Sequence, residues 1–329
     1  MPVKLAYVVS SGHSGSTLLD LIIGSIPGGF STGEFNYFPW QISRQEELGG
    51  KSTPQMLCSC GEPFRTCEVW SSVIEEISEL KKLDIYEKPY NFRLNILQNK
   101  KFHGKTFSYD RLARAIYMLG LRYRALGLAS AVINKGYVEA AKNNWLIWDA
   151  VLKQLNRKFI VDSSKSELRL KLLFEARPEN VRAIILLRDI RGVAYSAQKR
   201  GYDPLQAAEG WVKQYNRIWQ VIKSIPGLQF MCVRYEDIVG DPVAARSSIA
   251  KFLGHKCEES AFNIDTNLCH MVAGNKMRYK GAISIRADDS WHTGMPENLQ
   301  NIIKIIESQL EPGWTRHLSE RADSESKKG

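Results

Sequence analysis

The chain has 329 residues, of which 44% are apolar and 24% are charged, so it is large enough to bury a sizeable core. These proportions exclude global disorder, and no sequence period supports a collagen-like or coiled-coil chain. The 45 Lys and Arg residues outnumber the 35 Asp and Glu residues, which gives a net charge of +10. This excess predicts an anionic partner: a nucleic acid, a phosphorylated cofactor, an acidic substrate or a membrane surface.

Nothing in the sequence indicates a membrane-spanning or a secreted protein. No stretch approaches the roughly 18 consecutive apolar residues that a membrane span needs. The N-terminus opens directly on an apolar strand without a cleavage site. The six Cys residues are too few for a disulfide scaffold, which fits a reducing compartment. We therefore expect a cytoplasmic protein without a transmembrane segment.

Short apolar runs alternate with helical patterns along much of the chain. We predict strands over 4–10, 159–162, 181–187 and 228–233, and helices over 17–25, 168–176, 193–199 and 205–225. Strands that are apolar throughout fit a sheet that is covered on both faces. The alternation predicts an open parallel α/β sheet, in which ligands bind at the carboxyl ends of the strands.

The strand signal disappears between residues 36 and 155, where 111–128 and 139–155 have helical patterns. We predict a largely helical insertion in a single domain that spans 1–329, with a disordered polar tail over 321–329.

Most of the net charge lies in the segment 88–124, which holds nine basic residues, one acidic residue and interleaved aromatic residues. Such a segment could bind nucleic acid, lie on a membrane, cap an acceptor pocket or form a solvated face. No named nucleic-acid motif accompanies it. We therefore interpret it as part of the acceptor side or as a solvated face, and we expect no nucleic-acid partner.

A turn rich in Gly and Ser joins the first predicted strand to the helix that follows. Its residues are Gly12, His13, Ser14, Gly15, Ser16 and Thr17. Such a turn directs backbone N–H groups and the positive end of a helix dipole at one point, so it predicts an oxyanion site. No Lys precedes Ser16 or Thr17, so the ATP-type loop is absent and a magnesium-dependent kinase is disfavoured. A plain Gly-rich turn is the alternative.

A second anion site is expected where the strand over 181–187 ends. Arg188 leaves this strand, and Ser196 lies about two turns into the following helix. A guanidinium and a hydroxyl suit a terminal phosphate, although a surface Arg paired with Asp189 would give the same pattern. Two anion sites on adjacent strand ends suit a nucleotide with phosphates at both ends.

Three segments resemble successive motifs of a known enzyme family. They are SGHSGSTLL, LLRDIRGVAYS and VRYEDIVGDP. Their order and spacing are similar to those of sulfotransferases that use 3′-phosphoadenosine 5′-phosphosulfate (PAPS), in particular the bacterial and tyrosylprotein branches. The resemblance implies an α/β, P-loop-like three-layer fold with a central parallel sheet and the helical insertion. It covers 3–35, 159–254 and about 270–315.

The same resemblance implies roles for the two anion sites. The loop 12–17 would hold the 5′-phosphosulfate of PAPS as cosubstrate, and Arg188 and Ser196 would hold its 3′-phosphate. The family is known to need no metal, so we expect none in this reaction.

Sulfuryl transfer needs an in-line nucleophile, a base for its proton and cations that stabilise the leaving phosphate. Glu34 follows the edge of a second short strand, and the resemblance implies that it is the base, with a helix-capping Glu as the alternative. Lys165, just past the strand over 159–162, resembles the family Lys that contacts the transferring group. Asp162 is an alternative base.

His13 departs from the family, which has Lys or Arg at this position of the loop. A neutral imidazole provides one donor rather than a fixed positive charge. Either the bound anion protonates His13, or Lys165 carries the electrostatic load. We therefore include His13 among both the catalytic and the cofactor-binding residues.

A late basic segment over 274–281 resembles the family loop that closes over the nucleotide. It makes Arg278 and Lys280 candidates for binding the cofactor, with a solvated basic loop as the alternative. The segment 234–237 suits a structural network at the end of a strand, and Trp291 suits packing.

Three Cys residues lie close together in the insertion, at Cys58, Cys60 and Cys67. They could bind zinc, but the usual C-x2-C spacing is missing and His103 is only a speculative fourth ligand. Free structural thiols are the first interpretation, a disulfide is the second and zinc is the third.

The sequence thus predicts a sulfotransferase in which Glu34 takes the proton of a hydroxyl, or an amine, on a small-molecule or carbohydrate acceptor. The phosphate loop and Lys165 would stabilise the leaving nucleotide. The alternatives are a P-loop kinase or NTPase and a non-catalytic nucleotide-binding module. The acceptor and the oligomeric state stay open.

Overall fold

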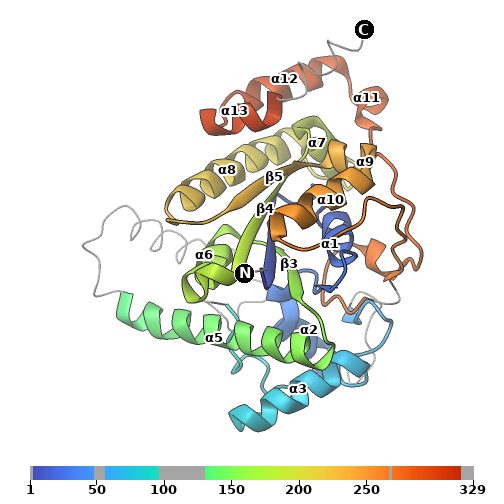
Figure 1. The fold of residues 1–329 in the computed structure, drawn as a ribbon. Coiled ribbons are helices and arrows are strands. Elements are labelled where there is room, and N and C mark those ends of the chain that lie inside the picture. Colours follow the sequence, from blue (N-terminus) through green and yellow to red (C-terminus); the bar gives the residue numbers. More distant parts are fainter. Residues whose placement is uncertain (1–2, 48–55, 96–129, 267–268, 320–329) are drawn as a thin grey trace.

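Five parallel strands form the central sheet of the computed structural model, which describes residues 3–47, 56–95, 130–266 and 269–319 (Figure 1). The spatial order is β2-β3-β1-β4-β5. The strands are β1 (Leu5–Val9), β2 (Gly29–Ser31), β3 (Phe159–Lys165), β4 (Val181–Leu187) and β5 (Phe230–Arg234). Because every pairing is parallel, the carboxyl ends of all five strands lie at one edge of the sheet. The predicted open parallel α/β sheet is confirmed.

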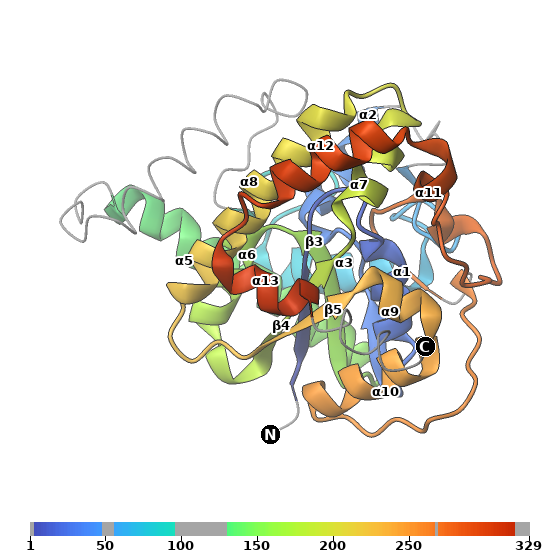
Figure 2. The same cartoon turned by 90° about the horizontal axis from the view of Figure 1, so that it is seen from above.

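Helices cover both faces of the sheet, so the fold has three layers (Figures 1 and 2). Alternate residues of β1 divide between two apolar cores: Tyr7 and Val9 belong to one core, and Ala6 and Val8 to the other. This alternation explains why β1 is apolar at every position.

Among the described residues, the smaller core lies under three helices and the larger core lies under eight. The first set is α1 (Ser16–Gly24), α9 (Tyr235–Gly240) and α10 (Pro242–Leu253). The second set is α2 (Phe38–Glu47), α3 (Glu68–Lys81), α5 (Ser130–Gln154), α6 (Glu167–Ala176), α7 (Ile190–Gln198), α8 (Pro204–Lys223), α12 (Glu297–Glu307) and α13 (Pro312–Ser319). Short turns complete the described chain: η1 (Phe35–Tyr37), η4 (Pro178–Asn180), η6 (Lys276–Tyr279) and α11 (Trp291–Gly294).

Side-chain caps define the starts of four helices, two of which follow strand ends. Ser166 caps α6, Asp189 caps α7, Asp203 caps α8 and Asp241 caps α10, each through its side-chain oxygen. The first helix differs, because α1 follows Gly15 and has no side-chain cap. Its first turn therefore keeps backbone N–H groups that a ligand can satisfy.

The observed elements match the predicted ones, with shifts at the ends. The prediction for β4 has the observed bounds, whereas β5 starts and ends later than expected and β3 runs on to Lys165. The three-residue strand β2 provides the expected second strand edge before Glu34.

The described part of the predicted insertion is helical and has no strand, as expected. Its aromatic residues Trp70 and Trp148 lie in the same apolar core as Leu5 and Tyr7 of the sheet. The predicted helix over 111–128, most of the basic segment 88–124 and the tail over 321–329 lie outside the described residues. The single-domain organisation stays a prediction. In the part of the chain that the structure describes, no helix is both long and apolar enough to span a membrane.

Candidate active site

The loop between β1 and α1 lies at the carboxyl edge of the sheet, where the sequence predicts an oxyanion site. Gly15 adopts a left-handed conformation with φ +91°, and a Cβ atom there would lie 2.6 Å from the Tyr235 ring. A side chain at position 15 would therefore be strained and would also clash. At Gly12 a Cβ atom would meet nothing within 4 Å, so the loop has an open side there.

The hydroxyl groups of the loop differ in their partners. The Oγ atoms of Ser11 and Ser14 are 2.6 Å apart, and both side chains are buried. Thr17 Oγ1 accepts a hydrogen bond of 3.1 Å from the backbone N–H of Asn275. Thr17 thus ties the loop to a segment that lies far away in the sequence.

Glu34 and Lys165 form an ion pair at the ends of neighbouring strands. Lys165 Nζ donates to Glu34 Oε1, and each side chain is less than one-fifth exposed. The pairing register explains the position of the Lys: Tyr7 lies opposite Asp162, but Val9 lies opposite Lys165, so β3 carries one extra residue. Such a bulge reorients a side chain beside a site.

The Glu34 carboxylate does not cap the turn that follows. Glu34 occupies the cap position of η1, but its side chain makes no capping hydrogen bond. Its backbone N–H donates to the carbonyl oxygen of Ala273 at 3.0 Å. The preceding Gly33 has φ +70°, and a Cβ atom there would lie 2.2 Å from that same oxygen. Position 33 must therefore be Gly for the two segments to meet.

His13 is surrounded by cations. Arg200 Nη1 lies 2.7 Å from His13 Nδ1. Burial lowers the pKa of His13, and the positive charges of Arg200, Lys165 and Arg188 lower it further. The imidazole is therefore neutral at neutral pH and accepts the hydrogen bond from Arg200.

His13 and Lys165 also share an unusual backbone conformation. Both have positive φ, +62° and +67°, although neither is Gly. Two further described non-Gly residues share this feature, Lys82 at the C-cap of α3 and Asn156 just after α5. A positive φ is common where a helix ends, which explains the conformation of Lys82 and Asn156. His13 and Lys165 do not follow a helix, so their positive φ values are a feature of the site itself.

Arg188 is buried beneath the phosphate loop and does not pair with Asp189. Its guanidinium donates to the His13 carbonyl oxygen at 3.0 Å and to Asp288 Oδ2 at 3.2 Å, and it lies 4.3 Å from the Tyr235 ring centre. Asp189 pairs instead with Arg191. The surface-Arg alternative is therefore wrong.

The surroundings of Arg188 are shaped for an anion. Burial opposes ionisation of Asp288, but hydrogen bonds from Ser290 and Arg188 outweigh it and lower the pKa of Asp288. The carboxylate is therefore ionised, as a phosphate in its place would be. A Cβ atom at Gly192 would lie 3.1 Å from Arg188 Nε, so Gly192 leaves room for the guanidinium. Ser196 lies one turn after Gly192 on the same helix α7 and is half-buried.

A cavity of about 640 Å³ opens beside these strand ends, within the usual size range of a small-molecule site. We call the set formed by 12–17, Glu34, Lys165 and Arg188 the strand-end wall; of this set, Glu34 lines the cavity. We call the segment 273–279 the far wall. The cavity is lined by Glu34, Tyr37, Trp40, Gln41, Arg200, Ala273, Gly274, Asn275, Lys276, Arg278 and Tyr279.

The two residues predicted from the late basic segment are placed differently. Arg278 reaches the cavity but is almost wholly buried, and its guanidinium donates to the carbonyl oxygens of Met271 and Leu57 at 3.3 and 3.2 Å. Lys280 is exposed and is not among the described residues that line the cavity. Lys276 of the same segment does line it.

Asp162 is not placed to act as a base. It has no exposed surface, and Arg169 Nε and Nη2 both lie 3.1 Å from its Oδ2. Its Oδ1 accepts from the backbone N–H and the hydroxyl of Ser164. The alternative assignment of the base to Asp162 is therefore wrong, because its carboxylate is fully used in holding the end of β3.

Sequence reasoning missed three residues at the site. Arg200 lies just after α7, outside every motif, and only its positive charge could have suggested an anion-binding role. Asp288 and Asn275 reach the site from segments whose positions depend on the tertiary fold. The segment 234–237 forms the expected structural network: Tyr235 supports Arg188, and Glu236 Oε1 accepts from the Asp189 N–H at 2.9 Å.

The fold and the site together define a P-loop-like α/β protein, with a Gly- and Ser-rich loop and several cationic side chains at the carboxyl edge of a parallel sheet. A family model described as the sulfotransferase family matches residues 6–259, so the chain belongs to that family. The prediction of a sulfotransferase is confirmed at this level.

Solved structures with similarity to the chain include other sulfotransferases. The sulfotransferase domain from the curacin biosynthetic pathway is 17% identical, with 94% of this chain and 99% of that chain covered and a TM-score of 0.48. The sulfotransferase domain of the Synechococcus PCC 7002 olefin synthase is 18% identical, with 93% and 94% covered and a TM-score of 0.46. Retinol dehydratase, in a complex with retinol and PAP, is 15% identical, with 95% and 83% covered and a TM-score of 0.33. No curated protein matches the chain.

Proposed function

We propose that the chain transfers the sulfuryl group of PAPS to a hydroxyl or amine of a small-molecule or carbohydrate acceptor, with Glu34 as the base. The observation that carries this proposal is the ion pair between Glu34 and Lys165, which joins a proton acceptor to a cation at the cavity beside the phosphate loop. Sulfuryl transfer needs both groups at the reacting centre.

The strand-end wall suits a nucleotide with anionic groups at both ends. The first turn of α1 has no side-chain cap, so its N–H groups and helix dipole are available for the 5′-phosphosulfate. Arg188 and Ser196 suit the 3′-phosphate, which would replace the carboxylate of Asp288 on the guanidinium.

Charge at the loop is the point at which this chain departs from its family. His13 accepts a hydrogen bond from Arg200 and its pKa is lowered by burial and by nearby cations, so His13 itself brings no positive charge. We assign that charge to Arg200, which reaches the loop position from the end of α7. The chain thereby regains a cation where the family has Lys or Arg.

The chemistry divides between the base and the cations. The acceptor oxygen or nitrogen forms a bond to sulfur while the bond from sulfur to the 5′-phosphate oxygen breaks, and the electron pair of that bond remains on the phosphate. Glu34 takes the acceptor proton, and Lys165 stabilises the charge that develops on the phosphate oxygen. The ion pair holds the Glu34 carboxylate in one orientation before the acceptor arrives.

The cavity supports a small acceptor with a ring or an apolar body. Tyr37 and Trp40 stand edge to face with ring centres 6.3 Å apart, and Tyr279 joins them in the lining. Aromatic faces bind sugar rings and apolar ligands, and Gln41 adds a polar group for orientation.

Isothermal titration calorimetry tests the donor. We expect 3′-phosphoadenosine 5′-phosphate to bind with one site per chain, and magnesium-ATP not to bind. Binding of magnesium-ATP alone would overturn the proposal in favour of a kinase or NTPase.

Mass spectrometry then tests the transfer and identifies the acceptor. An extract of source cells is incubated with the enzyme and PAPS that carries ³⁴S, and labelled sulfate adducts are sought. We expect adducts that disappear with Glu34→Gln and persist with the matched surface variant Glu209→Gln. Nucleotide binding without any labelled adduct would favour a non-catalytic binding module.

A further inference from the structure

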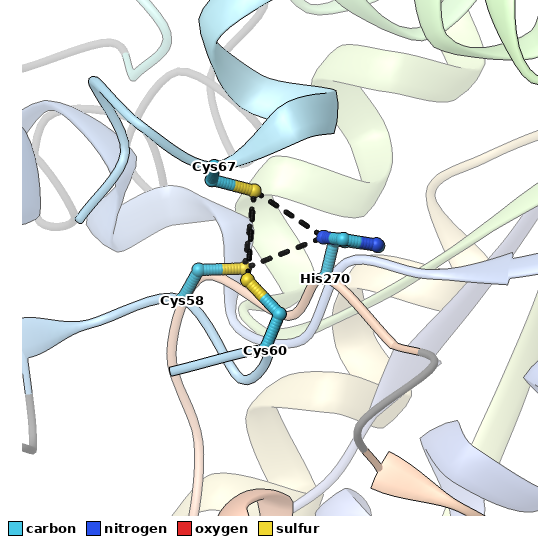
Figure 3. A group of neighbouring side chains, drawn as sticks. All are labelled: Cys58, Cys60, Cys67 and His270. Carbon is cyan, nitrogen blue, oxygen red and sulfur yellow. Dashed lines mark hydrogen bonds between the residues drawn. The ribbon is translucent and has the colours of Figure 1, made fainter. Parts of the chain in front are cut away.

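Three sulfur atoms and one imidazole nitrogen meet in a cluster that lies outside the lining of the cavity. They belong to Cys58, Cys60, Cys67 and His270, and the four atoms all lie within 4.8 Å of one another (Figure 3). We propose that this cluster is a structural zinc site.

Four of the six separations among these atoms are close to the edges of a tetrahedron around zinc, and none of the six exceeds 4.8 Å. With Zn–S bonds of about 2.3 Å and a Zn–N bond of about 2.0 Å, the edges should be roughly 3.8 Å between sulfurs and roughly 3.6 Å between sulfur and nitrogen. The Cys67 sulfur lies 3.7 Å from both the Cys58 and the Cys60 sulfur. His270 Nδ1 lies 3.2 Å from the Cys67 sulfur and 3.8 Å from the Cys58 sulfur.

These distances exclude a disulfide in the structure and weaken the interpretation as plain structural thiols. A disulfide needs sulfurs about 2.0 Å apart, and the described cysteines are all unbridged. Thiols that merely fill a core would have no reason to converge on one imidazole nitrogen. Soft thiolates with imidazole in a tetrahedron are the donor set that selects zinc over magnesium or calcium.

The sequence does not reveal the fourth ligand, because that residue lies far from the three Cys residues along the chain. His270 lies 203 residues after Cys67 and reaches the cluster only through the fold. His103, the fourth ligand considered from the sequence, lies outside the described residues. The C-x-C spacing was a poor match to common zinc motifs, but the missing ligand was the decisive gap, and His270 fills it.

The surroundings of His270 hold its ring as a ligand would need. Its second nitrogen, Nε2, lies 3.6 Å from Glu68 Oε1, on the side away from the sulfurs. Zinc-binding His residues commonly direct the other ring nitrogen to a carboxylate in this way. The ring stacks on Phe30, and the backbone carbonyl accepts from Trp70 Nε1 at 2.7 Å. Ring and backbone are thus both fixed.

The site is closed, so its role is structural. Four protein ligands complete the coordination of zinc and leave no position for a substrate or a water molecule. Cys58, Cys67 and His270 are each buried. A structural zinc here is compatible with sulfuryl transfer that uses no metal.

The zinc would join two distant segments that build the far wall. Ser59, between two of the ligands, is hydrogen-bonded to the backbone of Cys269 and Met271. Leu57 accepts from the side chains of Arg278 and Tyr279, which line the cavity. The ion would therefore hold the loop around Cys58 against the segment that carries the far wall.

Metal analysis of the full chain tests the site independently of the proposed reaction. The protein is purified under reducing conditions and its zinc is measured by inductively coupled plasma mass spectrometry. We expect one zinc per chain, retained by Cys257→Ser outside the cluster and by His270→Cys, which keeps four ligands. Cys67→Ser should lose most of it. Equal zinc in Cys67→Ser and the parent would overturn the proposal, because the metal would then lie elsewhere.

Cobalt substitution covers the case in which Cys67→Ser fails to fold. The unmodified chain, loaded with Co²⁺, should show thiolate-to-cobalt charge-transfer bands and the intense visible bands of a tetrahedral site. His270→Cys should strengthen the charge-transfer absorption, because a fourth thiolate replaces the imidazole. A folded parent chain that holds no zinc and gives only the weak spectrum of an oxygen-bound octahedral ion would overturn the proposal.

Discussion

The strand-end wall and the far wall, which meet the cavity at Glu34 and along 273–279, are built in different ways. The strand-end wall uses residues at or shortly after the ends of β1, β2, β3 and β4, so a short, local piece of chain brings each of them to this edge of the sheet. The far wall is held by contacts between segments that are far apart, such as the one between Ser59 and Met271. Local motifs therefore determine the position of the strand-end wall, whereas tertiary contacts determine the position of the far wall.

This difference matters for the proposed function, which gives the two walls different tasks. Charged groups of the strand-end wall can be removed one at a time with effects on binding or catalysis. Changes behind the far wall should act on stability first, because they loosen a segment rather than remove a reacting group. The four predictions below test this division, in order of decreasing expected effect.

The largest effect is expected from the proposed base. Glu34→Gln keeps the shape of the side chain but removes its ability to take a proton, so turnover should fall by roughly 10²- to 10⁴-fold. The dissociation constant for 3′-phosphoadenosine 5′-phosphate should stay within about twofold, since an uncharged amide adds no bulk at the nucleotide. Steady-state kinetics and calorimetry measure the two quantities. Turnover equal to that of the control Glu209→Gln would refute the assignment.

A pH effect is expected behind the strand-end wall, at Asp20 of α1. This carboxyl is fully buried, and burial raises its pKa from 3.8 to about 7 despite the nearby hydroxyls of Ser163 and Ser31. The folded state thus retains a proton that the unfolded state releases. The stability that Asp20 contributes should therefore fall as the pH rises from about 4 to about 7.

Thermal denaturation of Asp20→Asn at several pH values measures this loss. The amide does not titrate, so the free energy of unfolding of the variant relative to the parent should rise between pH 5 and pH 7, with a limiting slope of about 1.4 kcal/mol per pH unit. The difference in Tm should rise with it. Asp289→Asn, at an exposed position, should show no such trend. A difference for Asp20→Asn that is independent of pH would contradict the buried, protonated carboxyl.

The charge at the phosphate loop can be moved between residues. Arg200→Ala should weaken binding of 3′-phosphoadenosine 5′-phosphate by about tenfold, or ~1.4 kcal/mol, because the loop loses its nearest cation. Adding His13→Lys in that background should restore most of the affinity by returning the family's charge to the loop itself. Calorimetry at fixed ionic strength measures both changes. Failure of the second substitution to restore binding would argue that Arg200 acts through the position of His13 and not through its charge.

Much of the strand-end wall could be predicted from the sequence, because its signals are local. The apolar run before Gly12, the turn itself and the position of Arg188 after β4 each depend on a few adjacent residues. Parallel strands bring their carboxyl ends to one edge, so finding the strands was enough to bring Glu34 and Lys165 together. Asp162 was misread because its partner, Arg169, lies in the next helix and buries it.

The far wall could not be predicted in the same way. Nothing near Leu57 in the sequence indicates that its carbonyl oxygen accepts from Arg278, whose basic type predicts a ligand contact but not this structural bond. The guanidinium is buried by segments that meet only in the folded chain. The same physical reason hid His270, whose role depends on sulfurs that lie 203 or more residues away.

The smallest effect is expected from Ser59, which joins the two segments behind the far wall without touching the cavity. Its Oγ donates to the Cys269 carbonyl oxygen at 2.6 Å and accepts from the Met271 N–H at 2.8 Å. Ser59→Ala removes both bonds and should cost about 1 kcal/mol, which lowers Tm by about 2 °C for a chain of this size. The surface variant Ser247→Ala, which loses only a bond to exposed Glu259, should leave Tm nearly unchanged.

Kinetics then decide which wall Ser59 serves. The proposed function places the acceptor in the cavity that the far wall lines, so on that proposal the KM for the acceptor should rise while the affinity for 3′-phosphoadenosine 5′-phosphate stays constant. A loss of nucleotide affinity equal to the loss for the acceptor would show that the two walls move as one unit. That result would break the division between local and tertiary construction, because a contact behind one wall would then position the charges of the other.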